Sequence, residues 1–288
     1  MNKAQKSIYT KHGITLDGDK LVTPVGERIC PLLPIGSNGK VGDAGTWSIW
    51  HGCETRGVDS FGEHTRAVME AFNVREITGS CPCHCKGCYC DAHRQAWDSN
   101  IALAVRKLLL ASMYPDWTKR AILAQIEADE LKQVRVHAQG DFKLLTVDDA
   151  DDVPRAYAQM WADIVSACPD VEFWTYTKYE PALDALDGLR NMHITPSLTP
   201  AGINFGTCAE LIEMYYSLTG MGYGVHICAC GTPYQRKCSD CHKGCKRVGV
   251  DVDFVLFIKH STPDYKAGRH DAADFAALLE IVRAQEEA

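Results

Sequence analysis

VREITGSCPCHCKGCYC, residues 74–90, places five cysteines in a ten-residue loop directly behind a run that is typical of a buried strand. Cys81, Cys85 and Cys88 have the spacing C-x3-C-x2-C. Three thiolates at this spacing can hold three irons of a cubane cluster and leave the fourth iron open, because no fourth cysteine is forced onto it. An open iron implies a ligand from outside the protein.

The sequence around this loop alternates short β-branched or aromatic runs with segments of helical periodicity. After 74–80, the runs are 134–142, 171–178, 192–199, 223–230 and 252–259. The clearest helical segment puts six apolar side chains on one face: Val153, Tyr157, Met160, Trp161, Ile164 and Val165. Alternating strands and helices indicate parallel βαβ units, in a doubly wound sheet or a barrel. In both, ligands bind at the carboxyl ends of the strands, where the cysteine loop also lies.

The chain divides at about residue 73. Residues 1–73 carry scattered Pro and Gly turn signals without sustained periodicity, which predicts an irregular N-terminal extension that packs on the remainder. Residues 74–288 are predicted to form an α/β domain, a partial (β/α)6 barrel of parallel strands. A Cys-rich, metal-binding insertion is expected at 228–248, after the fifth strand.

Composition narrows the class of protein. The 46% hydrophobic content is typical of a globular chain, and no apolar run reaches the roughly 18 residues of a membrane span. The N-terminus lacks the apolar core of a signal peptide, so we expect a cytoplasmic protein with no membrane partner. A net charge of −7 argues against broad electrostatic binding of nucleic acid. Ten of the fourteen cysteines lie in two tight clusters, which favours metal over disulfides.

The second cysteine cluster lies within 228–245 and offers four metal ligands: Cys230, Cys238, Cys241 and Cys245. Cys228 and His242 are possible substitutes. Four protein ligands close the coordination sphere of a metal site. Both an auxiliary iron–sulfur cluster and a structural zinc knuckle fit this set, and the sequence leaves the two open.

The cysteine loop behind the first strand of a six-fold βα pattern resembles the radical S-adenosylmethionine (radical SAM) superfamily, whose signature is C-x3-C-x2-C at this place. Within that superfamily, five features resemble the phage gene product 88 family: TWS (46–48), CY (88–89), VRVHAQGDF (134–142), WTYTK (174–178) and the late cysteine cluster. Resemblance to that family implies no particular activity. The superfamily resemblance implies a four-iron four-sulfur cluster on Cys81, Cys85 and Cys88, SAM as a bound cofactor, and a reducing partner such as flavodoxin or ferredoxin.

The resemblance also implies a SAM contact at the end of the second strand, where the superfamily has a glycine-rich turn that ends in an acidic residue. Gln139, Gly140 and Asp141 occupy this place. Asp141 is expected to accept a charge-assisted hydrogen bond from the SAM ammonium. Because Gly-Asp after a strand is also ordinary turn chemistry, a role limited to capping the turn is the alternative.

Two further pairs of strand-end side chains are candidate ligand contacts: Tyr176 and Lys178 for the substrate or the SAM carboxylate, and Ser197 and Thr199 for the ribose hydroxyls. Strand-end hydroxyls also commonly satisfy local backbone groups only. The predicted function is reductive cleavage of SAM to start radical chemistry on an unknown substrate. The alternative is a zinc-stabilised, non-catalytic module that binds nucleic acid or protein, because Cys83, His84, Cys90 and His93 add further zinc ligands.

Overall fold

The structure is a computed structural model of mixed α/β class, which describes residues 1–35, 43–52, 54–81, 97–138, 140–144, 152–179, 181–196, 208–228, 254–257 and 272–287. Its helices are α1 (Lys3–Lys11), the 3-10 turn η1 (Val58–Ser60), α2 (Glu63–Ala71), α4 (Asp98–Met113), α5 (Pro115–Ala128), α6 (Asp152–Ala167), α7 (Pro181–Leu186), α8 (Cys208–Gly220) and α10 (Ala272–Glu287). Its strands are β1 (Leu16–Asp17), β2 (Lys20–Val22), β3 (Arg28–Ile29), β4 (Gly45–Thr46), β5 (Arg56–Gly57), β6 (Glu76–Ile77), β7 (Gln133–Arg135), β8 (Glu172–Thr177), β9 (Met192–Pro196), β10 (Val225–Cys228) and β11 (Phe254–Phe257).

The central sheet has the strand order β4-β7-β8-β9, and all its strands are parallel. Helix α6 connects β7 to β8, and α7 connects β8 to β9, so the predicted parallel βαβ order is present for these three strands. The predicted strand 134–142 is too long, because β7 ends at Arg135. The described part of the chain shows small open sheets and no closed one. The partial six-fold barrel therefore stays a prediction.

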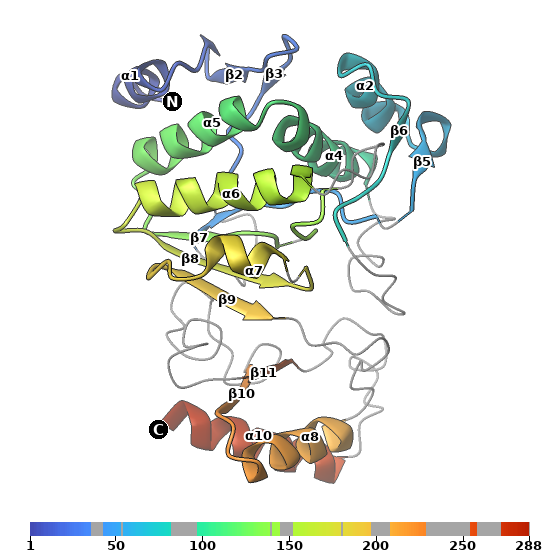
Figure 1. Ribbon diagram of the computed structural model, residues 1–288, viewed down its shortest axis with the longest axis vertical. Coiled ribbons are helices and arrows are strands. Elements are labelled where there is room, and N and C mark those ends of the chain that lie inside the picture. The colour runs from blue at the N-terminus through green and yellow to red at the C-terminus, as the bar shows by residue number, and fades with distance from the viewer. Residues whose placement is uncertain are drawn as a thin grey trace.

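Helices α5 and α6 lie against one side of this sheet (Figure 1). The face of α6 predicted from periodicity is buried there, at Tyr157, Met160, Trp161, Ile164 and Val165. Val134 and Phe173, which point to the same side from β7 and β8, are fully buried in the same apolar cluster. Burial of this stripe against the sheet fixes the helix layer, since area removed from water is the main stabilising term.

The strand next to β7 comes from the N-terminal segment and not from 74–80. Gly45 and Thr46 pair in parallel with Val134 and Arg135. The backbone of Trp47 extends this pairing, because its N–H donates to Arg135 O and its carbonyl accepts from Ala138 N. Residues 74–80 contain only β6, which pairs antiparallel with β5. The edge of the central sheet is thus supplied by residues expected to belong to the extension.

Residues 1–73 are more regular than their sequence suggested. Asn2 and Gln5 form a reciprocal capping box at the start of α1, and a three-stranded antiparallel sheet β1-β2-β3 follows. Helix α1 of this segment packs on α5 of the helix layer. Lys11 and His12 both contact the carboxylate of Glu127 on α5 at 2.8 Å.

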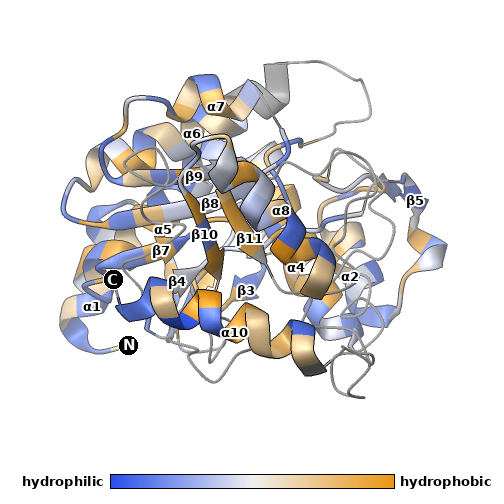
Figure 2. Ribbon diagram, turned by 90° about the horizontal axis from the view of Figure 1, so that it is seen from below, coloured by the Kyte–Doolittle hydropathy of each residue, from blue (hydrophilic) through white to orange (hydrophobic). Residues whose placement is uncertain are grey.

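The C-terminal part has an apolar cluster of its own. β10 and β11 pair in parallel and pack with α8 and α10 around six buried residues: Cys208, Leu211, Ile227, Leu256, Leu278 and Val282. Figure 2 shows β11 in the colour of hydrophobic residues, beside α8 and α10. Gln285 of α10 closes the cluster, since its amide donates to Val225 O at 2.8 Å and accepts from Ile227 N at 3.0 Å.

Within the described ranges, no helix combines the length and the apolar character that a membrane crossing requires.

Candidate functional site

The segments that follow β4, β7 and β8 meet at the carboxyl edge of the central sheet, together with the residues that lead into the cysteine loop. The backbone N–H and the hydroxyl of Ser80 both donate to Trp50 O at 2.9 Å. The same hydroxyl accepts a hydrogen bond from Asp141 N at 2.9 Å. Ser80 directly precedes Cys81, which is partly buried. The start of the cysteine loop is therefore bonded to the Gly140–Asp141 turn.

Gly140 is required by this contact. Its φ of +88° lies in the left-handed region, where side chains are strained. A Cβ at this position would lie 2.6 Å from Ile49 Cγ1 and 2.7 Å from Ser80 Oγ. The absence of a side chain lets the β7 turn approach both the segment after β4 and the start of the cysteine loop.

Asp141 is a buried carboxylate, 4% exposed, that joins the β7 turn to the end of β8. Its Oδ1 accepts from Phe142 N at 2.7 Å and from Thr177 Oγ1 at 2.5 Å, and its Oδ2 accepts from Lys178 N at 2.8 Å. Burial raises the pKa of this carboxyl, while the hydrogen bonds from Thr177, Lys178 and Phe142 act in the opposite direction.

The three hydrogen-bond donors to Asp141 are neutral groups, and the positive charge of the Lys178 side chain lowers the pKa of the carboxyl without a direct ion pair among the described residues. A carboxylate has about four acceptor positions, so one position on Oδ2 stays open. A buried charge is costly unless it is paired. Asp141 can therefore hold the β7 turn against the end of β8 and also accept a hydrogen bond from a small cation.

The two faces of the central sheet differ in character. Side chains alternate along a strand, so Trp174 and Tyr176 of β8 point away from the face that carries Phe173. On this second face the Arg135 guanidinium lies 5.5 Å from the Tyr176 ring centroid, and His193 Nε2 lies 3.5 Å from Glu172 Oε1. Parallel sheets covered on both sides are usually apolar on both. The second face is therefore more polar than the helix-covered face, although Trp174 is buried on it.

A buried hydrogen-bond network lies on the helix-covered side, close to the same turn. Trp47 Nε1 donates to Tyr157 Oη at 2.8 Å, and Tyr157 Oη lies 2.7 Å from His137 Nε2. The indole N–H of Trp47 can only donate, so Tyr157 Oη accepts this bond, whereas the donor in the Tyr157–His137 contact depends on the imidazole tautomer. Burial lowers the pKa of His137 to about 3, so the ring is neutral. His137 also has a φ of +58°, a conformation rare for histidine.

Sequence reasoning missed the members of this site that act through tertiary contact: Trp47, Ser80, His137 and Tyr157. The signals for two of them were present, since Trp47 belongs to the TWS stretch and Ser80 immediately precedes the first cysteine. His137 lies two residues before the turn at 139–141, but no local sequence pattern predicts its left-handed backbone conformation.

The predicted site residues fall into two groups. Gly140, Asp141, Tyr176 and Lys178 lie at the carboxyl edge of the central sheet, and Cys81 follows Ser80 there. The others lie outside the described residues: Gln139, Ser197, Thr199, Cys85, Cys88, Cys230, Cys238, Cys241 and Cys245. In the part of the chain that the structure describes, no three His, Cys, Asp or Glu side chains are grouped to hold a metal ion. The metal ligands therefore stay predictions.

Comparison with known proteins gives one match. A family model described as Gene product 88 matches residues 52–214, more than half of the chain. The matched range contains the first cysteine cluster, the Gly140–Asp141 turn, β8 and β9, and it ends before the second cluster. No curated protein and no solved structure matches the chain.

Proposed function

The chain belongs to the gene product 88 family, and we propose that it is a radical SAM enzyme that binds an iron–sulfur cluster on Cys81, Cys85 and Cys88. The single observation that carries the proposal is the hydrogen bond between Ser80 Oγ and Asp141 N, 2.9 Å long. It brings the start of the cysteine loop beside a buried carboxylate that keeps an open acceptor position on Oδ2. A cluster and the ammonium of a small ligand would need these two features side by side.

The residues present fit such a ligand. Asp141 keeps an acceptor position on Oδ2, and a charge-assisted hydrogen bond to an ammonium is about twice as strong as one between neutral groups. Gly140 lets the turn that carries Asp141 approach Ser80, since a Cβ there would lie 2.7 Å from Ser80 Oγ. The thiolates of the loop are the ligand type that iron–sulfur clusters require. When bound, the cluster supplies an electron that cleaves SAM.

The residues around the turn hold and orient the ligand. Thr177 and the Lys178 backbone fix the Asp141 carboxylate, so its open acceptor position has one direction. Tyr176, held beside Arg135, and the Lys178 side chain are assigned to the substrate or to the SAM carboxylate. Ser197 and Thr199 are assigned to the ribose hydroxyls. The buried aromatic network of Trp47 and Tyr157 keeps water from the back of the turn.

The second cysteine cluster is proposed to hold a second metal, either an auxiliary iron–sulfur cluster or a zinc ion. An external reductant such as flavodoxin or ferredoxin would supply the electron. The substrate that receives the radical chemistry is not assigned.

The test is anaerobic purification followed by quantitation of iron, sulfide and zinc. The protein should be brown and should release methionine and 5′-deoxyadenosine from SAM after reduction with dithionite. Cys85→Ala should abolish SAM cleavage and the part of the colour that comes from the first cluster. Cys30→Ala, at an exposed cysteine, is the matched control and should change neither.

Asp141→Asn removes the charge and one hydrogen bond of the turn, because the asparagine NH2 cannot accept from the Lys178 N–H. SAM affinity should fall by ~10- to 100-fold while iron content stays constant. Thr177→Val removes one neutral hydrogen bond and keeps the charge, so SAM affinity should change by less than ~5-fold. Equal loss of affinity in both variants, or colourless protein that contains zinc in place of iron, would reject the proposal. The second result would favour the zinc-stabilised binding module.

A further inference from the structure

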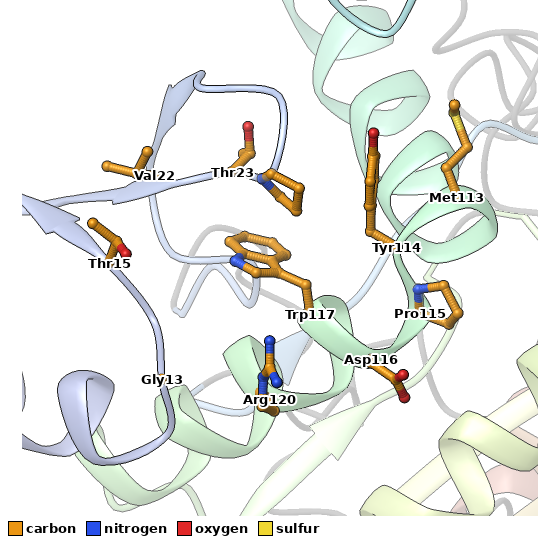
Figure 3. Close-up of a pocket in the computed structure, with 11 residues that line it drawn as sticks. Gly13, Thr15, Val22, Thr23, Met113, Tyr114, Pro115, Asp116, Trp117 and Arg120 are labelled. Atoms are coloured by element: carbon orange, nitrogen blue, oxygen red, sulfur yellow. The ribbon is translucent and has the colours of Figure 1, made fainter.

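A pocket of about 530 Å³ lies between the N-terminal sheet and the junction of α4 with α5, away from the residues of the candidate site. Its walls come from residues 13–15 and 22–24 on one side and from 113–117 and Arg120 on the other (Figure 3). Sites for small molecules typically measure about 300–1,000 Å³. The pocket is therefore large enough for a compact organic ligand.

Hydrogen-bond donors line one part of this pocket. Trp117 is 9% exposed, and its indole N–H has no acceptor among the described residues. Arg120 lies one turn further along α5 and makes no ion pair with any described carboxylate. The hydroxyl of Thr15 is likewise unpartnered in the described ranges. Figure 3 shows the Arg120 guanidinium beneath the indole, with Thr15 across the space from the indole nitrogen.

The acceptor groups of the lining do not compete for the donors around Trp117. The Asp116 carboxylate is exposed, lies 4.0 Å from Lys119 Nζ and points away from Trp117 and Arg120 (Figure 3). Thr23 Oγ1 accepts a hydrogen bond from Glu27 N at 3.0 Å. What remains open in the described structure is a set of donors that includes one full positive charge. Donors of this kind select an oxyanion, because arginine matches carboxylate and phosphate with a planar fork.

The rest of the wall is apolar and aromatic. Tyr114 stands on the side of the pocket opposite Thr15, and Met113, which is 45% exposed, lies beside it (Figure 3). Pro24 and Pro115 complete this wall. Aromatic side chains bind flat or apolar groups through large contact areas. The pocket thus combines a cationic end with an apolar end.

We propose that this pocket binds a small ligand in which a carboxylate or a phosphate is attached to a flat, apolar body. The oxyanion contacts Arg120 and the indole N–H of Trp117, and the flat body lies against Tyr114. This site is independent of the cysteine loop and of the function proposed for it.

The experiment is isothermal titration calorimetry of the full chain with four probes. Phenylacetate and uridine 5′-monophosphate carry the two kinds of oxyanion, and phenylacetamide and uridine are their uncharged counterparts. Each charged probe that belongs to the pocket should bind at least ~10-fold more tightly than its neutral counterpart. Binding of only one charged probe supports the proposal and identifies the oxyanion as carboxylate or phosphate.

Variants localise the binding. Arg120→Gln should weaken the charged probes by ~10- to 100-fold and leave the neutral probes unchanged. Trp117→Phe keeps an aromatic ring but removes the N–H, and should weaken them by ~3- to 10-fold. Arg66→Gln makes the same charge change at an exposed position on α2 and should have no effect. Failure of both charged probes to bind at millimolar concentration, or binding that Arg120→Gln leaves intact, overturns the proposal.

Discussion

Replacing Lys107 with methionine should make the protein more stable at low pH and should have little effect at high pH. Lys107 of α4 is 2% exposed, and its Nζ lies 5.2 Å from the centroid of the Trp47 ring. No carboxylate of the described residues pairs with it. Burial lowers the pKa of this ammonium from 10.5 to about 7. The folded protein therefore holds a cation in a place that disfavours it.

The size of the effect follows from the two pKa values. At ~1.4 kcal/mol per pKa unit, the difference between 10.5 and about 7 amounts to ~5 kcal/mol of lost unfolding free energy below pH 7. The cation–π contact with Trp47 offsets ~1–2 kcal/mol of this loss. The net loss of unfolding free energy is therefore ~3 kcal/mol. Between the two pKa values the unfolded chain binds more protons than the folded one. The stability of the wild-type protein should therefore rise with pH through this window.

Urea unfolding at pH 6, 7.5 and 9 measures this difference, with both proteins at equal metal content. Lys107→Met should be more stable than the wild type by ~3 kcal/mol at pH 6, and the gain should shrink as the pH rises. Methionine fills the space of the lysine stem, so a cavity does not offset the gain. Lys132→Met, at an exposed lysine, should show no such trend. A constant difference at all three values, or a less stable variant at pH 6, would refute the reasoning.

Three further substitutions test one contact of the site and two contacts of the fold, each by urea unfolding against the wild type. Gly140→Ala should lower the free energy of unfolding by more than ~1 kcal/mol, because alanine is strained at a φ of +88° and its Cβ would overlap Ile49 and Ser80; an unchanged midpoint would contradict the close approach. Asn191→Ala should cost ~2 kcal/mol, since its side-chain amide donates to three backbone carbonyls between α6 and β8, and Asn191→Asp should not restore them. Glu27→Gln should cost ~1–2 kcal/mol by breaking the paired 3.0 Å bonds from Arg106, and a loss that vanishes in moderate salt would show that the pair is not partly buried.

The parts of the fold that follow from local pattern could be read from the sequence. The runs 171–178 and 192–199 are rich in β-branched and aromatic residues, and they form β8 and β9. The apolar stripe on α6 was visible because helical periodicity needs only one segment to show itself. The Gly140–Asp141 turn after β7 was also recognisable, because its pattern lies within one short segment.

Features that depend on distant partners could not be read. β4 is two residues long and begins with glycine, so its strand character comes from pairing with β7 and not from its composition. The partners of Asp141 at Thr177 and Lys178 likewise belong to the next βα unit. The local sequence around Asp141 is therefore the same whether its side chain is buried and bonded to a second loop or exposed in a turn.

The origin of β4 has a consequence for how the chain is made. During synthesis this strand emerges long before β7, its partner, because α2, α4 and α5 are translated between them. Until β7 has been synthesised, the apolar segment around Trp47 has no strand to pair with. Pairings of this kind slow folding and leave time for association between nascent chains. Slower translation between β4 and β7 should therefore lower the yield of correctly folded protein, and a fragment that starts after the N-terminal segment would expose the edge of β7 to other chains.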